Sequence, residues 1–167
     1  VLFRDVVTAA DTTASSHASL FTSVYPPSHG VSHLAKRFSI EQRALAEVMQ
    51  RGGYRTVAAV GVEYLSSFFG LSVGFDDYYN SSGFDTLFHQ ATRWKTTSRI
   101  AFSVRRRLFS MNHHWRAGDS TNQRLLRWLE VNHDKPFMSW IHYFDAHEYE
   151  SQSQYDSHLR FVDSRVR

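Results

Sequence analysis

Hydroxyl side chains gather near the start of the chain and form the first candidate site. They belong to Thr12, Thr13, Ser15 and Ser16. We expect a short helix over residues 16–24, ended by the prolines and the glycine of residues 25–30. The N-terminus of a helix presents unpaired N–H groups and a partial positive charge, which suit a sulfate or a phosphate, and a protonated His17 would add to that charge. Simple N-capping by Ser15 or Ser16 would explain the same hydroxyls.

A carboxylate and an imidazole follow the most apolar run of the chain. Residues 137–144 are typical of a central strand, because nearly every position is apolar and Pro136 bounds the run. Ligands of open α/β sheets lie beyond the carboxyl ends of the strands, which makes Asp145 and His147 a second candidate site. If the strand continued, these two side chains would share one face, able to bind a metal or exchange protons, and His142 would face the other way. The competing interpretation is that Asp145 starts a turn and His147 lies at the surface.

Helices and buried strands alternate between these two sites. We expect a helix from Ser39 to Gly52, then a buried strand over residues 54–61. A second clear helix covers residues 119–130, with Asp119 as its cap and an apolar face made of Leu125, Leu126, Trp128 and Leu129. Residues 63–116 have no clear period, and we expect them at the surface. The alternation predicts one α/β layer structure.

Composition excludes several classes of protein. The 167 residues are 42% hydrophobic and 15% aromatic, which is enough for the core of one domain. A net charge of +3 does not indicate a nucleic-acid partner, and no apolar run is long enough to span a bilayer. The absence of cysteine excludes disulfides, thiolate metal sites and a cysteine nucleophile. We expect a piece of a longer protein, because no signal peptide opens the chain and its last residues stop within a helical pattern.

Several segments follow one another in the order of a known family. They are Thr13-Ala-Ser-Ser-His-Ala-Ser-Leu-Phe-Thr-Ser23, Tyr25-Pro-Pro-Ser-His-Gly-Val31, Leu45-Ala-Glu-Val-Met-Gln-Arg-Gly-Gly-Tyr-Arg-Thr56, Gly74-Phe-Asp-Asp-Tyr78 and the stretch from Lys135 to Tyr149. In this order they resemble the sulfatase family of the alkaline phosphatase superfamily. The resemblance implies an α/β fold, an alkaline-phosphatase-like α/β/α sandwich with a mostly parallel central sheet, incomplete at both ends. Residues 1–167 would then be part of a sulfatase-type catalytic domain, periplasmic or extracellular.

The resemblance also implies a role for each candidate residue. Thr13 takes the position of the nucleophile and of a metal ligand. His17 takes the position of the basic residue that stabilises the bound anion. His147 matches a histidine that contacts the sulfate or the leaving group. The implied substrate-binding residues are Ser16, Asp145 and His147. A divalent metal is implied, with Ca²⁺ expected and Zn²⁺ or Mn²⁺ as alternatives, and its other ligands are expected before Val1 and after Arg167.

Departures from the family signature change the expected chemistry. Sulfatases oxidise Cys or Ser to formylglycine, whereas oxidation of Thr13 would give a ketone, so formylglycine is not expected. Superfamily relatives with threonine at this position use the hydroxyl directly after a metal lowers its pKa. Ser15 replaces a proline and His17 replaces an arginine, so a permanent bidentate cation becomes an imidazole that is charged only below about neutral pH.

The sequence therefore predicts a metal-assisted, sulfatase-like hydrolase of sulfate esters. The substrate would be a small-molecule or glycan ester, with no nucleic-acid partner and no membrane segment; the oligomeric state stays open. One alternative is a phosphodiesterase or phosphotransferase that uses Thr13 directly. Another is an inactive relative, or an anion-binding module built on the basic segment from Arg93 to Arg107, although such a charge run usually marks a solvated helix face.

Overall fold

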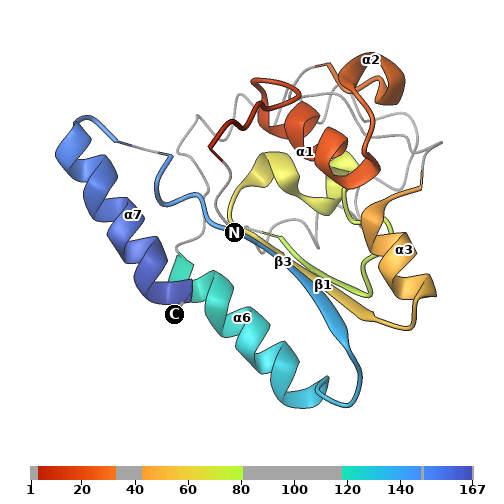
Figure 1. The fold of residues 1–167 in the computed structure, drawn as a ribbon. Helices are drawn as coiled ribbons and strands as arrows, with labels where there is room; N and C mark the ends of the chain where they lie inside the picture. Colours follow the sequence, from red (N-terminus) through yellow and green to blue (C-terminus); the bar gives the residue numbers. More distant parts are fainter. Residues whose placement is uncertain (1–3, 33–42, 81–117, 148, 167) are drawn as a thin grey trace, which may run out of the picture.

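A computed structural model describes residues 4–32, 43–80, 118–147 and 149–166 of the chain, and a small parallel sheet lies at its centre (Figure 1). The strands are β1 (Arg55–Val60), β2 (Asp77–Tyr79) and β3 (Phe137–His142), in the order β2-β1-β3. The helices are α1 (Thr13–Thr22), α2 (Pro26–His29), α3 (Leu45–Arg51), α6 (Gly118–Val131) and α7 (Gln152–Val166), with 3-10 turns η1 (Glu63–Leu65) and η2 (Ser67–Phe69). Both strand pairs are parallel, with Arg55 opposite Phe137 in the longer one.

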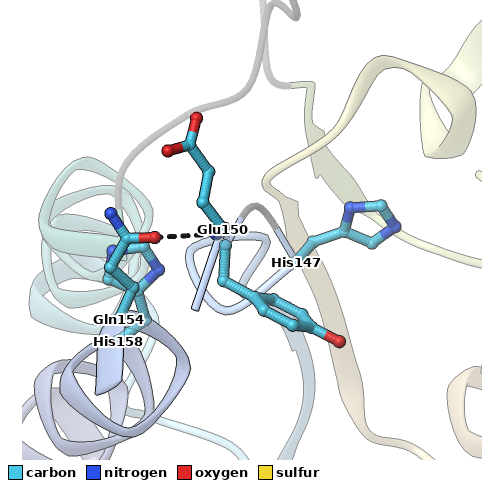
Figure 2. Close-up of a pocket in the computed structure, with 5 residues that line it drawn as sticks. His147, Glu150, Gln154 and His158 are labelled. Carbon is cyan, nitrogen blue, oxygen red and sulfur yellow. Dashed lines mark hydrogen bonds between the residues drawn. The ribbon is translucent and has the colours of Figure 1, made fainter. Parts of the chain in front are cut away.

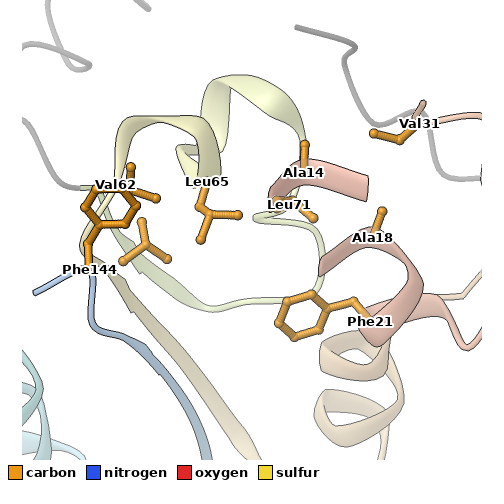
Figure 3. Packing of buried hydrophobic residues seen from close by; sticks show 9 residues of the cluster. Ala14, Ala18, Phe21, Val31, Val62, Leu65, Leu71 and Phe144 are labelled. Carbon is orange, nitrogen blue, oxygen red and sulfur yellow. The ribbon is translucent and has the colours of Figure 1, made fainter. Parts of the chain in front are cut away.

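Apolar side chains cover both faces of the sheet. On one face, Val60 packs in a cluster with Ala14, Ala18 and Phe21 of α1, three residues that Figure 3 labels. Trp140 packs against this cluster. On the other face, Val57 of β1 packs with Leu125 and Trp128 of α6, and Ile141 of β3 joins them. Figure 1 shows α1 and α3 on one side of the strands and α6 on the other. The predicted α/β/α arrangement with a parallel sheet is confirmed for the described residues.

The Gly-Phe-Asp segment ties β2 and α3 to β1. The Asp76 carboxylate accepts hydrogen bonds from the Thr56 backbone N–H at 2.8 Å and from Gln50 Nε2 at 2.6 Å. Burial acts to raise the pKa of Asp76, but the hydrogen bonds from Thr56 and Gln50 outweigh it and hold that pKa below its ordinary value. Gly74 has a φ of +82°, and a Cβ there would lie 2.3 Å from the backbone nitrogen of Glu47. No side chain fits at this position.

Several predictions about the elements are wrong. Helix α1 begins at Thr13 rather than Ser16, and α3 begins at Leu45, where the Glu47 carboxylate accepts the Ala44 N–H at 2.9 Å. The expected cap Ser39 lies outside the described residues. Leu126 does not belong to the apolar face of α6, because it is 58% exposed. The predicted helix and strands at residues 119–130, 54–61 and 137–144 are confirmed with slightly different ends.

Residues 63–80 are not the surface region that the sequence predicts. Leu65 and Leu71 are buried in the cluster beneath α1, and the strand β2 lies where a loop is expected. Short 3-10 turns and a strand of this length have too few residues to show a hydrophobic period, so the pattern missed them. The rest of the predicted surface region, with the basic residues from Arg93 to Arg107, lies outside the described residues.

Replacing Asp76 by alanine should destabilise the fold. The substitution Asp76→Ala removes the acceptor of the Thr56 N–H at the start of β1, and we expect the free energy of unfolding of the complete protein to fall by about 1 to 2 kcal/mol. Urea unfolding of this variant and of Asp5→Ala, an exposed carboxylate, measures the difference. Equal stability of the two variants would show that the Gly-Phe-Asp segment does not hold the strand.

Candidate active site

Thr13 is the first residue of α1, at a helix N-terminus that no side chain of the described residues caps. Thr12 stands at the N-cap position with extended backbone angles, φ −103° and ψ 144°, and makes no side-chain cap hydrogen bond. Its hydroxyl is buried and has no hydrogen-bond partner in the described part of the chain. The first-turn N–H groups therefore have no acceptor from the N-cap side chain, and they carry the partial positive charge of the helix end.

The alternative interpretation, N-capping by Ser15 or Ser16, is wrong. Ser15 is buried and donates to the carbonyl of Val31 at 2.6 Å, away from the helix end. The Ser16 hydroxyl donates to the carbonyl of Thr13 at 3.2 Å. Because the helix begins earlier than the sequence predicts, both serines lie inside its first turns. Ser16, a predicted substrate-binding residue, is half-buried beside Thr13.

The Tyr-Pro-Pro-Ser-His-Gly-Val segment holds α1 along the side of the helix that carries Ser15 and Ser19. His29 is buried, and its Nδ1 accepts the Val31 N–H at 3.1 Å. Its Nε2 must then carry the proton, and it donates to the Ser19 hydroxyl at 2.9 Å. Together with the hydrogen bond from Ser15 to Val31, this contact holds α1 at two positions one turn apart, Ser15 and Ser19. The segment positions the helix that carries Thr13.

The side chain of His17 points from α1 toward β3 rather than toward the open N-terminus of the helix. Its Nδ1 is 2.8 Å from the Thr13 carbonyl oxygen, and since a carbonyl only accepts, Nδ1 carries the proton. The ring centroid lies 5.5 Å from that of Trp140 and 5.3 Å from that of His142. Burial lowers the pKa of His17, and the hydrogen bond to Thr13 only partly offsets that effect. The imidazole is therefore neutral at neutral pH and supplies no charge to an anion.

His142 ends β3 on the same side of the sheet as His17. Burial, then the neighbouring His17 and His147 rings, lower the pKa of His142 to about 4. Its Nδ1 is buried and has no hydrogen-bond partner among the described residues. Its ring lies 6.3 Å from that of Phe144, on which the His147 ring stacks at 4.2 Å. A row of rings thus runs from α1 to the loop after β3.

Asp145 and His147 do not share one face. The strand ends at His142, and a turn over residues 145–147 is closed by the His147 N–H, which donates to the Phe144 carbonyl at 3.0 Å. Asp145 is buried and its Oδ1 accepts the backbone N–H of Gly118, the first residue of α6, at 3.0 Å. His147 instead lies exposed on Phe144. The structure matches the competing interpretation, in which Asp145 starts a turn and His147 is a surface residue.

Comparison with known proteins connects this geometry to a family. The sequence model of the Sulfatase family matches residues 1–165. The chain belongs to the sulfatase family. The segment that resembles the family signature, Thr13 to Ser23, forms α1 and its C-cap, and the stretch from Lys135 to Tyr149 contains β3 and the turn after it. The predicted family resemblance is confirmed.

A solved structure supports the fold of this sulfatase-family chain. The phosphonate monoester hydrolase of Agrobacterium radiobacter is similar to it, with a TM-score of 0.50 at 13% sequence identity. The match covers 81% of this chain and 32% of that enzyme, so the chain spans about a third of its length. A search of curated protein sequences finds no match.

The described residues of this sulfatase-family chain do not by themselves form a metal centre. No three His, Asp or Glu side chains among them are placed to hold one ion. Thr13 is the one ligand that the family resemblance assigns here, and stable sites for divalent ions need several oxygen or nitrogen ligands. In the part of the chain that the structure describes, no helix is long and apolar enough to cross a membrane.

Sequence reasoning missed part of this site. The contact of His17 with His142 and Trp140 was not predicted. One signal for it was available, because side chains alternate along a strand and Trp140 and His142 therefore lie on the same face of β3. No sequence pattern indicated that four further residues lie beside His147, because they come from an irregular loop and from an exposed helix. They are Tyr149, Glu150, Gln154 and His158.

Acid should destabilise the protein through His142. The unfolded chain protonates this histidine near its ordinary pKa of 6.5, but the folded chain does so only near pH 4. The free energy of unfolding should therefore fall as the pH is lowered from about 6.5 to about 4, and stay level above that range. Urea unfolding at several pH values should show a flatter dependence for His142→Phe than for the exposed control His133→Phe. Identical slopes for both variants would exclude His142 as the cause.

Asp145 should contribute to stability through α6. Asp145→Ala removes the acceptor of the Gly118 N–H, and we expect the free energy of unfolding of the complete protein to fall by about 1 to 2 kcal/mol. Asp145→Asn keeps an oxygen acceptor and should lose less. Urea unfolding measures both. Unchanged stability together with a higher KM would return Asp145 to the predicted substrate-binding role.

Proposed function

We propose that the complete protein hydrolyses sulfate esters, with the Thr13 hydroxyl as the nucleophile. One observation carries the proposal: the residue at the signature position of a sulfatase-family chain is the first residue of α1, at an end that the side chain of its N-cap residue leaves open. A helix N-terminus of this kind attracts sulfate and phosphate groups through its backbone N–H groups and its dipole. The attacking oxygen and the anion-binding groups then belong to the same helical turn.

The reaction would proceed in two displacements. First, Thr13 Oγ1 bonds to the sulfur while the bond from sulfur to the leaving oxygen breaks, and the hydroxyl proton ends on the leaving alcohol. Water then attacks the sulfur of the sulfated threonine, which releases hydrogen sulfate and restores the hydroxyl. The first-turn N–H groups of α1 stabilise the charge on the sulfate oxygens in both steps. Neither step needs an oxidant or a reductant.

His17 acts in this proposal as a positioning residue. Its imidazole is neutral and its Nδ1–H is bound to the Thr13 carbonyl, so it fixes the first turn of α1 rather than neutralising the ester. His147 is exposed beyond β3, with a ring held by stacking on Phe144. It would contact the leaving group, as the family resemblance implies.

Phosphoryl transfer is the second candidate. A threonine cannot become formylglycine, and its hydroxyl can attack phosphorus directly. The structural neighbour is named as a phosphonate monoester hydrolase, which supports a phosphorus ester as a second candidate substrate. We infer a phosphate or phosphonate ester as the alternative substrate of Thr13. A divalent metal, with Ca²⁺ expected and Zn²⁺ or Mn²⁺ as alternatives, and a periplasmic or extracellular location stay predictions, as does the assignment of residues 1–167 to a larger catalytic domain.

Removing the Thr13 hydroxyl should abolish turnover. In the complete protein, Thr13→Ala should lower kcat for the preferred ester by about 10³-fold or more, because the attacking oxygen is lost. Thr13→Ser keeps a hydroxyl at the same place and should retain more activity. The measurement is release of 4-nitrophenol from its sulfate, its phosphate and its phosphodiester, with calcium, manganese or zinc supplied in turn.

Thr12→Ala is the matched control, because the Thr12 hydroxyl has no hydrogen-bond partner among the described residues. It should leave kcat within a few-fold of the parent. Turnover that survives Thr13→Ala would contradict the nucleophile assignment. Absence of turnover on every ester by the complete parent protein would favour the inactive relative, and binding of polyanions without cleavage would favour the anion-binding module.

A further inference from the structure

The imidazole of His17 connects the first turns of α1 to two rings of β3. Its ring centroid lies 5.5 Å from that of Trp140 and 5.3 Å from that of His142, with interplanar angles of 42° and 67°. Trp140 and His142 are two residues apart on β3, and their own rings lie 6.4 Å apart at an angle of 70°. Tilted and edge-to-face contacts of this kind favour defined ring orientations. The strand therefore holds the His17 ring in one orientation as well as in one place.

The same imidazole holds the backbone of Thr13. Its Nδ1–H donates to the Thr13 carbonyl at 2.8 Å, and the Ser16 hydroxyl donates to that oxygen at 3.2 Å. The N-cap residue Thr12 makes no side-chain cap hydrogen bond. The first N–H groups of a helix have no intrahelical acceptor, so side-chain contacts matter more in the first turn than in later ones. A displacement of the His17 ring would thus move the residue whose hydroxyl is the proposed nucleophile.

His142 carries a buried polar atom that needs an explanation. Its Nδ1 is buried and has no hydrogen-bond partner among the described residues. Buried polar atoms are normally paired, because an unpaired one lowers stability, and exceptions often serve a function. The ring takes its orientation from contacts with His17, Trp140 and Phe144 instead. Burial lowers its pKa to about 4, so the ring is neutral at neutral pH and adds no charge beneath α1.

Phe144 comes between His142 and the open pocket beyond β3 in the row of rings. Its ring lies 6.3 Å from that of His142 and 4.2 Å from that of His147. His147 lines this pocket of about 510 Å³, which Figure 2 shows. The other lining residues come from the loop after β3 and from α7, and they are Tyr149, Glu150, Gln154 and His158. The contact of His142 with His17 can therefore be tested apart from the residues of the pocket.

We infer that His142 is a positioning residue of the proposed reaction. Its ring holds His17, and His17 holds the Thr13 carbonyl, so the attacking oxygen keeps one position relative to the bound ester. The inference rests on the proposed function for the role of Thr13. In this arrangement His142 acts on Thr13 and not on the ester. Loss of its ring should slow the chemical step and leave substrate binding nearly unchanged.

Replacement of the ring tests this role. In the complete protein, His142→Ala should lower kcat by about tenfold for the 4-nitrophenyl ester that the parent cleaves best, with KM changed less than about twofold. His142→Phe keeps an aromatic ring at the same place and should retain kcat within about threefold of the parent. If His142→Ala does not fold, His142→Leu removes the ring with a smaller cavity and should show the same loss.

Ile141→Ala is the matched control for lost packing. Ile141 is the neighbouring residue on β3, and its side chain packs on the opposite face of the sheet, against the cluster of Val57, Leu125 and Trp128. This variant should lose stability but keep kcat. Equal kcat values for His142→Ala and Ile141→Ala would overturn the inference. A kcat for His142→Phe as low as that of His142→Ala would also overturn it.

A double-mutant cycle tests whether His142 acts through His17. In a protein that already carries His17→Ala, the further change His142→Ala should lower kcat by less than about twofold, because the contact between the two rings is already lost. A full tenfold loss in that background, about the same as in the parent, would contradict the connection through His17.

An NMR measurement separates this inference from the proposed function. The ring nitrogen signals of His17 report whether Nδ1 carries the proton, with or without turnover, and His17→Ala identifies them. The parent and His142→Phe should keep the proton on Nδ1, whereas His142→Ala should show it exchanging between the two nitrogens. If esters are cleaved but His142→Ala changes neither kcat nor these signals, His142 is excluded and the hydrolase stands. If no ester is cleaved but the signals respond as expected, the hydrolase fails and the contact that holds Thr13 stands.

Discussion

The close packing of α1 on the sheet is the constraint on which the rest of the structure depends. Ala14 and Ala18 are almost fully buried, and their small side chains let the helix approach Val60 and Leu65 beneath it. A second side of α1 is fixed by Ser15 and by the contact between Ser19 and His29. A helix held on two sides cannot tilt, so the position of its first turn is set by residues that take no part in chemistry. The open N-terminus at Thr13 is the result.

This packing also explains why a histidine stands where the family signature has an arginine. The position of His17 lies against Trp140 and His142, in surroundings that already keep both imidazoles neutral. A guanidinium cannot lose its charge and would have to be buried with it or turn away from the sheet. The neutral ring fills the space and still satisfies the Thr13 carbonyl. In the proposed reaction, anion recognition would depend on the helix end rather than on a fixed cation.

Residue patterns predicted the layers of this fold better than the details of its site. Long periodic elements such as α6 and β3 were visible because many apolar positions repeat along them. The short strand β2 and the 3-10 turns were missed, because elements this short have too few residues to show a hydrophobic period. The local pattern placed Thr13 in a cluster of hydroxyls, and its role as nucleophile, which stays a prediction, came from the order of family motifs. The sequence left two arrangements of Asp145 and His147 open, because the choice between them depends on where β3 ends and on the nearby start of α6.

The parallel pairing of β1 with β3 has a consequence for how the protein folds. Arg55 pairs with Phe137, so the two strands meet only after a long loop of chain has closed, and loop closure of this kind slows folding. The surface under α1 is built from both strands, from Val60 on one and Trp140 on the other. Helix α1 is synthesised first but has no complete surface to pack on until β3 has emerged. The proposed active site is therefore among the last parts of this chain to assemble.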